Sequence, residues 1–136
     1  MSQNTQLRTL VVDDSPSSLR ATSEVLQAAG FDVQTACEGE EAVSMVQQIL
    51  PDVVVLDIIL PKKTGFQVCR EIKTDPATRH VPVVLLSSKS QEADRFWGQR
   101  QGADAYLTKP VDPAELVAIV RAVGAGRSAD LESTQG

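Results

Sequence analysis

Five polar side chains of this sequence stand at the ends of short apolar runs. They are Asp13 and Asp14 after LVV, Asp57 after VVVL, Ser87 after VVLL, and Lys109 after AYLT. Parallel strands bring their carboxyl ends to one edge of a sheet, and open α/β sheets bind ligands at that edge. If the apolar runs are such strands, these five side chains share one crevice.

Three carboxylates in one crevice repel one another, which raises the pKa of at least one of them unless a cation lies among them. Oxygen donors without a nearby His or Cys favour a hard divalent ion, and Mg²⁺ is commonly held by a few carboxylates, waters and phosphate oxygens. A carboxylate can then attack phosphorus and form an aspartyl phosphate. Ser87 could donate a hydrogen bond to the phosphoryl group, and Lys109 could neutralise its charge. We therefore expect a site that accepts a phosphoryl group with Mg²⁺ as its cofactor.

The elements that must position these groups alternate along the chain. Apolar runs rich in Val and Leu predict strands over residues 7–12, 31–36, 52–57, 81–87 and 103–108. Apolar residues at helical spacing predict amphipathic helices over residues 19–29, 42–50, 66–72, 93–97 and 116–123. Buried strands separated by crossover helices form parallel sheets covered on both faces. We expect an α/β fold, a doubly wound parallel sheet of five strands with five helices.

The predicted ends of three helices carry capping signals. Ser15 before Pro16 and Asp112 before Pro113 place a capping side chain ahead of Pro at the first helical position. Thr64 is a candidate N-cap for the third helix. The first helix therefore begins immediately after the Asp13 and Asp14 pair, which fixes the direction of that pair.

Composition limits the classes of function that remain. A chain of 136 residues with 42% hydrophobic and 23% charged residues is typical of one globular domain. Its net charge of −5 and the lack of a Lys/Arg cluster argue against nucleic-acid binding. The apolar run over residues 53–60 contains an Asp and is too short to span a membrane. The first residues lack the pattern of a secretory signal, so we expect a cytoplasmic protein.

The domain and its two cysteines complete these expectations. We expect a flexible N-terminus over residues 1–6, one domain over residues 7–124, and a flexible C-terminal tail over residues 125–136. Cys37 and Cys69 lack CxxC spacing and predict two buried thiols, neither a disulfide nor a zinc site.

The motifs VVDDS, VVLDIILPKKTG, VVLLSSK and DAYLTKP together resemble the receiver domain of two-component response regulators over nearly the whole chain. The resemblance implies a flavodoxin-like sheet with strand order 2-1-3-4-5. It also implies transfer of a phosphoryl group from a sensor histidine kinase or a histidine phosphotransfer protein onto Asp57. The chain itself would then be a switch that assists its own phosphorylation and dephosphorylation, and would not be a free-standing enzyme.

The same resemblance implies a role for each site residue. It implies Asp57 as phosphoacceptor and four metal-ligating groups, which are Asp13 acting largely through water, Asp14, Asp57 and the backbone carbonyl of Ile59. Lys109 would neutralise the phosphoryl charge. Ser87 would meet the phosphoryl group as the switch hydroxyl, and Tyr106 would turn inward in response; packing alone is the alternative for Tyr106.

Four residues depart from the common family pattern or have an unassigned role. Ile59 and Lys89 flank the path by which water attacks the phosphoryl group, so we expect them to tune its lifetime. Phe96 and Trp97, on the fourth predicted helix, form a candidate partner surface, with ordinary packing as the equal alternative.

The resemblance extends to stand-alone regulators of chemotaxis and twitching motility, most of all in DRFWGQRQGADAYLTKP. We expect such a regulator, with a phosphate shuttle or sink in a phosphorelay as the alternative. We expect a monomer, and dimerisation on phosphorylation stays open. A phosphatase with an Asp nucleophile would need an acid two residues after Asp57, where Ile59 stands. A dinucleotide-binding domain would need a Gly-rich turn after the first strand, which DDSPSSLR lacks.

Overall fold

The computed structural model describes residues 7–87 and 102–135, with side chains described as far as residue 125. Its five strands are β1 (Arg8–Val12), β2 (Asp32–Ala36), β3 (Val53–Asp57), β4 (Val83–Ser87) and β5 (Ala105–Thr108). The helices in this part of the chain are α1 (Pro16–Ala28), α2 (Gly39–Ile49), α3 (Gly65–Thr74) and α5 (Pro113–Gln135). The helix predicted around residues 93–97 lies outside the described residues.

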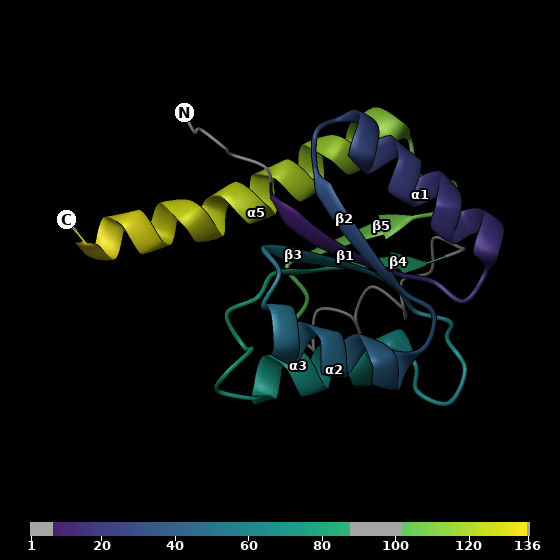
Figure 1. Ribbon diagram of the computed structural model, residues 1–136, viewed down its shortest axis with the longest axis horizontal. Coiled ribbons are helices and arrows are strands. Elements are labelled where there is room, and N and C mark those ends of the chain that lie inside the picture. The colour runs from purple at the N-terminus through teal and green to yellow at the C-terminus, as the bar shows by residue number, and fades with distance from the viewer. Residues whose placement is uncertain (1–6, 88–101, 136) are drawn as a thin grey trace.

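All five strands pair in parallel, in the order β2-β1-β3-β4-β5. The predicted fold class and strand order are therefore confirmed. Helices α2 and α3 lie on one face of the sheet, and α1 and α5 lie on the other (Figure 1). The chain switches sides of β1 between β2 and β3, and such a switch point opens a crevice at the carboxyl ends of the strands.

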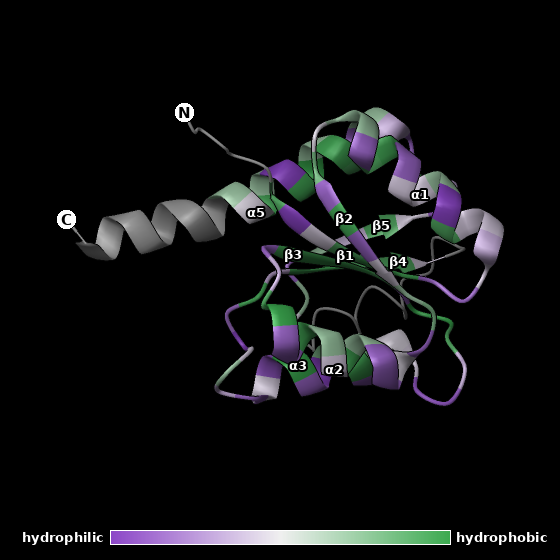
Figure 2. Ribbon diagram, in the orientation of Figure 1, coloured by the Kyte–Doolittle hydropathy of each residue, from purple (hydrophilic) through white to green (hydrophobic). Residues whose placement is uncertain are grey.

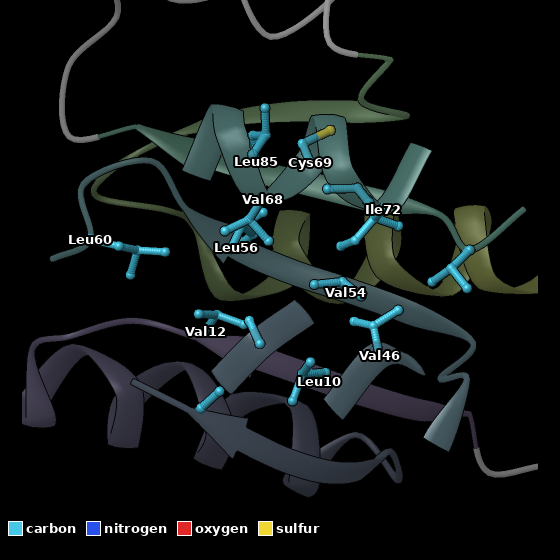
Figure 3. Packing of buried hydrophobic residues seen from close by; sticks show 14 of the residues in the cluster. Leu10, Val12, Val46, Val54, Leu56, Leu60, Val68, Cys69, Ile72 and Leu85 are labelled. Atoms are coloured by element: carbon cyan, nitrogen blue, oxygen red, sulfur yellow. The ribbon is translucent and has the colours of Figure 1, made fainter. Parts of the chain in front are cut away.

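Each face of the sheet has its own apolar core. Leu10, Val54, Leu56 and Leu85 pack with residues of α2 and α3 (Figure 3). Residues one position along the strands, such as Val11, pack with α1 and α5, because successive side chains of a strand point to opposite faces. The central strands β3 and β4 are buried throughout and hydrophobic along most of their length (Figure 2). A rigid double core thus holds the strand ends in place.

The two cysteines differ in exposure. Cys69 is buried and Cys37 is exposed, and both are free thiols. The expectation of a buried Cys37 is therefore wrong. Cys37 follows Ala36, the buried last residue of the edge strand β2, and alternation along an extended chain turns the next side chain toward solvent.

Helix α5 is longer than the sequence indicated. The expected tail begins at residue 125, whereas α5 continues to Gln135. Each Gly costs a helix only about 1 kcal/mol, and residues 124–135 contain two Gly and no Pro, so the helix need not end there. A Cβ at buried Gly124 would lie 2.8 Å from Leu7 Cδ1, so this Gly allows close packing. Within the described residues, no helix has the length and hydropathy to cross a membrane.

Candidate functional site

The sheet brings the predicted site residues to one edge. Asp13 follows β1, Asp57 and Ser87 end β3 and β4, and Lys109 follows β5. Asp13, Asp14 and Asp57 each offer a carboxylate oxygen, and these oxygens lie within 4.8 Å of one another. Asp13 and Asp57 are only 2% and 7% exposed, whereas Asp14 is exposed. The predicted cluster of three carboxylates is therefore present, with one open side.

Lys109 bridges the two buried carboxylates. Its Nζ lies 2.9 Å from Asp57 Oδ2 and 3.1 Å from Asp13 Oδ2. The sequence predicted Lys109 as a partner of the phosphoryl group, but did not predict that it also pairs with Asp13. With all three carboxylates ionised, one ammonium leaves two negative charges uncompensated. The donor set and its charge therefore fit a divalent cation with oxygen ligands.

Backbone N–H groups orient the other oxygen of each buried carboxylate. The N–H of Ser15 donates to Asp13 Oδ1 at 2.9 Å, and that of Ile59 donates to Asp57 Oδ1 at 3.1 Å. Ser15 is also the N-cap of α1. Its side-chain oxygen accepts a hydrogen bond from the N–H of Ser18 in the first turn of that helix. The predicted helix start therefore holds Asp13 in place, while its neighbour Asp14 faces solvent.

Burial and charge act in opposite directions at this site. Burial raises the pKa of Asp57, and the hydrogen bonds from Lys109 and Ile59 reverse this only in part. Burial alone would lower the pKa of Lys109, but hydrogen bonds to Asp57 and Asp13 outweigh it and raise that pKa. Lys109 is therefore charged at neutral pH, and the ionised form of Asp57 is less stable than in water.

A close approach of α3 shapes the loop after Asp57. The N–H of Gly65 donates to Ile58 O at 2.7 Å. A Cβ at Gly65 would overlap the carbonyl oxygen of Asp57 and lie 2.7 Å from Ile58 Cα. Thr64 caps α3 as predicted, in a capping box with Gln67. The sequence analysis did not predict the steric role of Gly65. The one local indication of that role is the position of Gly65 directly after the N-cap of α3.

The predicted switch residues lie on neighbouring strands. Ser87 is 4% exposed and pairs in register with Thr108, and Leu85 pairs with Tyr106. Tyr106 is partly buried against the core on the α2 and α3 face. Because Leu85 also lies in that core, alternation places Ser87 on the same face. Ser87 and Tyr106 thus lie on the same face of neighbouring strands, and their role as a switch stays a prediction.

Of the four remaining predicted residues, the structure describes only Ile59. It lies beside Asp57 and is 64% exposed. Lys89, predicted to act with it, lies outside the described residues. Phe96 and Trp97 lie there too, so their predicted role as a partner surface is untested.

A parallel 2-1-3-4-5 sheet with an acidic cluster and a paired lysine at its carboxyl edge defines a class of signalling domain. The family model for the response regulator receiver domain matches residues 9–121. The chain belongs to this family.

Relatives of known name agree with this assignment. The chain is 43% identical over 119 residues to protein PilH of Pseudomonas aeruginosa, covering 88% of this chain and 98% of PilH. It is also 43% identical over 116 residues to the response regulator PleD of Caulobacter vibrioides, covering 85% of this chain but 26% of PleD. Its match therefore spans nearly all of one relative and about a quarter of the other.

Solved structures share the fold. The chemotaxis response regulator CheY4 of Vibrio cholerae superposes with a TM-score of 0.82 at 31% identity, covering 88% of this chain and 99% of CheY4. The receiver domain of a sensor histidine kinase from Pseudomonas aeruginosa superposes with a TM-score of 0.83 at 27% identity, covering 89% and 99% of the two chains. That structure has a magnesium ion coordinated in its active site cleft.

Proposed function

We propose that this chain is a phosphoryl-accepting switch, in which Asp57 receives the phosphoryl group from a phosphohistidine with Mg²⁺ as cofactor. The observation that carries the proposal is the surroundings of Asp57. This buried carboxylate is bonded to Lys109 and lies within reach of two further carboxylates at the carboxyl edge of the sheet. A site of this kind combines a nucleophile with the charges that stabilise a transferred phosphoryl group.

The acidic cluster is the place for the metal. Asp13, Asp14 and Asp57 would hold Mg²⁺ together with the backbone carbonyl of Ile59, and their two uncompensated charges match its charge. The related histidine kinase receiver domain, which holds magnesium in its cleft, supports this choice of ion. When bound, Mg²⁺ would neutralise charge on the phosphoryl oxygens during transfer.

Residues of this chain would supply the nucleophile, its orientation and the groups that stabilise the transferred phosphoryl group. An oxygen of the Asp57 carboxylate forms the new bond to phosphorus, while the bond from phosphorus to the donor imidazole nitrogen breaks and its electron pair stays on the imidazole. The N–H of Ile59 orients Asp57 through Oδ1. Lys109 already lies 2.9 Å from Asp57 Oδ2, where it can neutralise the incoming group, and Ser87 donates a hydrogen bond to that group.

The output would be a conformational switch and not the turnover of a separate substrate. Ser87 moves toward the phosphoryl group and Tyr106 follows, which shifts the population between two forms of the partner-binding face. The match to nearly the full length of PilH supports a role in motility or taxis. Its phosphodonor would be a sensor histidine kinase or a histidine phosphotransfer protein in the cytoplasm.

The lifetime of the phosphoryl group would depend on Ile59 and Lys89. Ile59 stands two residues after Asp57 and is 64% exposed, so it can limit the approach of water to phosphorus. We expect exchange of both residues to change the rate of dephosphorylation. An unchanged decay rate in the double variant would contradict this assignment.

Intact mass spectrometry tests the proposal. The chain is incubated with a small phosphodonor such as acetyl phosphate, with Mg²⁺ or with EDTA. We expect the mass of one phosphoryl group to appear on the parent in Mg²⁺ only, and to be absent from Asp57→Asn. Asp32→Asn, the same change at the opposite edge of the sheet, serves as the control and should be labelled like the parent. An unlabelled parent in Mg²⁺ would overturn the proposed function.

A further inference from the structure

The loop between β3 and α3 must be held in place for the proposed metal site to work. Its residue Ile59 orients Asp57 through a backbone N–H at 3.1 Å. Its residue Lys62 has a φ of 70°, in the left-handed region that residues other than Gly disfavour. Ile59, Pro61 and Lys62 are all exposed, so core burial of these side chains does not fix the turn. Core burial of Ile58 and Leu60 anchors the first half of the loop, so the turn at Lys62 depends on further contacts from neighbouring elements.

The start of α2 supplies one such contact. A Cβ at Gly39 would lie 2.7 Å from Lys63 Cβ and 3.0 Å from both Lys63 O and Val68 Cγ2. Gly39 is buried, and its φ lies outside the left-handed region, so close packing is the reason for Gly here. The backbone of α2 therefore presses directly on the loop at Lys63 and on α3 at Val68. Any side chain at position 39 would displace one of them.

An ion pair joins the same two segments. Lys62 Nζ lies 3.4 Å from Glu38 Oε1, which ties the left-handed residue of the loop to the N-cap of α2. From the other side, Lys63 Nζ lies 2.6 Å from Glu71 Oε2 of α3. The loop is thus held between the start of α2 and the side of α3, two helices that pack side by side on one face of the sheet (Figure 1).

We propose that Glu38 and Gly39 are positioning residues for the metal site, although neither belongs to its cluster of carboxylates. They hold the turn at Lys62 and Lys63, and the turn sets where Ile59 lies relative to Asp57. The inference rests on the proposed function, since it concerns the affinity of the Asp57 site for Mg²⁺. Gly39 contributes most, because its packing is buried, and Glu38 contributes less, because its ion pair is largely exposed.

Calorimetric titration of the full chain with Mg²⁺ measures this effect directly. Residues that orient metal ligands typically change metal affinity by roughly 10- to 100-fold when mutated. We expect Gly39→Ala to weaken Mg²⁺ binding about tenfold, and Glu38→Gln about twofold. Glu40→Gln, the same chemical change two residues along α2, is the matched control and should bind Mg²⁺ like the parent. Lys63→Gly in the Gly39→Ala background removes the nearest clashing atom and should restore part of the affinity.

Hydrogen exchange of the metal-free proteins separates positioning from general instability. We expect the Ile59 amide to exchange faster in Gly39→Ala, while the amides of β1 keep the rate of the parent. Equal acceleration at Ile59 and in β1 would overturn the inference, as would a Mg²⁺ affinity equal to that of the parent. If Gly39→Ala fails to fold, a charge swap of the ion pair provides the test. We expect Glu38→Lys to weaken Mg²⁺ binding, and the double variant Glu38→Lys with Lys62→Glu to regain the lost affinity. A parent that binds no Mg²⁺ would instead refute the proposed function.

Discussion

At the scale of single residues, the charge of Asp57 is linked to the stability of the fold. Its pKa is raised above the ordinary value of 3.8, first by burial, with Lys109 opposing the shift. A carboxyl whose folded pKa exceeds its unfolded pKa stabilises the fold below the unfolded pKa, and that contribution is lost as pH rises through the folded pKa. Near neutral pH, and without metal, the ionised Asp57 therefore lowers the free energy of unfolding.

Asp57→Asn removes this charge while keeping the shape of the side chain. In EDTA at pH 7, we expect the variant to have a higher Tm than the parent, by roughly 3–6 °C. In Mg²⁺ the difference should shrink or reverse, because the parent gains stability from the ion and the variant has lost a ligand. Differential scanning calorimetry in both buffers checks the sign. A variant that is less stable than the parent in EDTA would contradict the assigned role of burial.

The two thiols differ because of their surroundings. Burial raises the pKa of Cys69 to about 12, and the charge of Glu41, whose Oε1 lies 3.6 Å from the sulfur, raises the pKa of exposed Cys37. Since thiolates are the reactive form, Glu41→Gln should speed alkylation of Cys37 severalfold at pH 8, with Glu40→Gln as control. Cys69 should react only after unfolding in urea. Peptide mass spectrometry over time follows both residues, and equal rates at Cys37 and Cys69 would refute this prediction.

At the residue scale, the site was predictable where it depends on strand ends. Asp13, Asp57 and Ser87 could be placed together because parallel strands share an edge. The second bond of Lys109, to Asp13, depends on how far the loop after β5 reaches across the sheet, which no local pattern records. The exposure of Cys37 likewise depends on which way the chain turns after an edge strand.

At the scale of elements, capping connects helix stability to the site. Thr64 accepts from the N–H of Gln67, whose side chain in turn accepts from the N–H of Thr64 at 2.8 Å. Gly65, the next residue, contacts the backbone at Asp57. The start of α3 therefore lies directly behind Asp57.

Thr64→Ala should remove this cap and lower the free energy of unfolding by about 1 kcal/mol. Thr74→Ala, at the other end of α3, is the control, since its hydroxyl donates to the carbonyls of Arg70 and Glu71 in its own helix. We expect a change within about 0.5 kcal/mol. Urea denaturation of both variants provides the measurement. Equal losses for the two would show that the capping box adds nothing to stability.

Helix starts were more predictable than helix ends and close approaches. Ser15 and Thr64 act as N-caps because their side chains satisfy specific backbone N–H groups, and that signal is local. The sequence predicted a flexible tail from residue 125, but α5 continues to Gln135, and Gly124 leaves room for Leu7. Gly39 fits against Lys63 and Val68, which are distant in the sequence, and Gly65 fits against the backbone at Asp57 across the loop after β3, so their steric roles required the structure.

At the scale of the whole molecule, the alternation of strands and helices was enough to predict a parallel α/β fold. The strand order came from the resemblance of four motifs to receiver domains, because periodicity alone does not say which strands are neighbours. The order in turn brings Asp13 of the first βα unit beside Asp57 and Lys109. A site assembled from such distant segments depends on the entire sheet.

The most direct test of this account is to locate the phosphoryl group within the acidic cluster. The chain is phosphorylated in Mg²⁺, reduced with borohydride, which converts an aspartyl phosphate to homoserine, and mapped by tandem mass spectrometry. We predict homoserine at position 57 and unmodified side chains at Asp13, Asp14 and Ser87. Modification at one of those three residues, with Asp57 intact, would contradict the account.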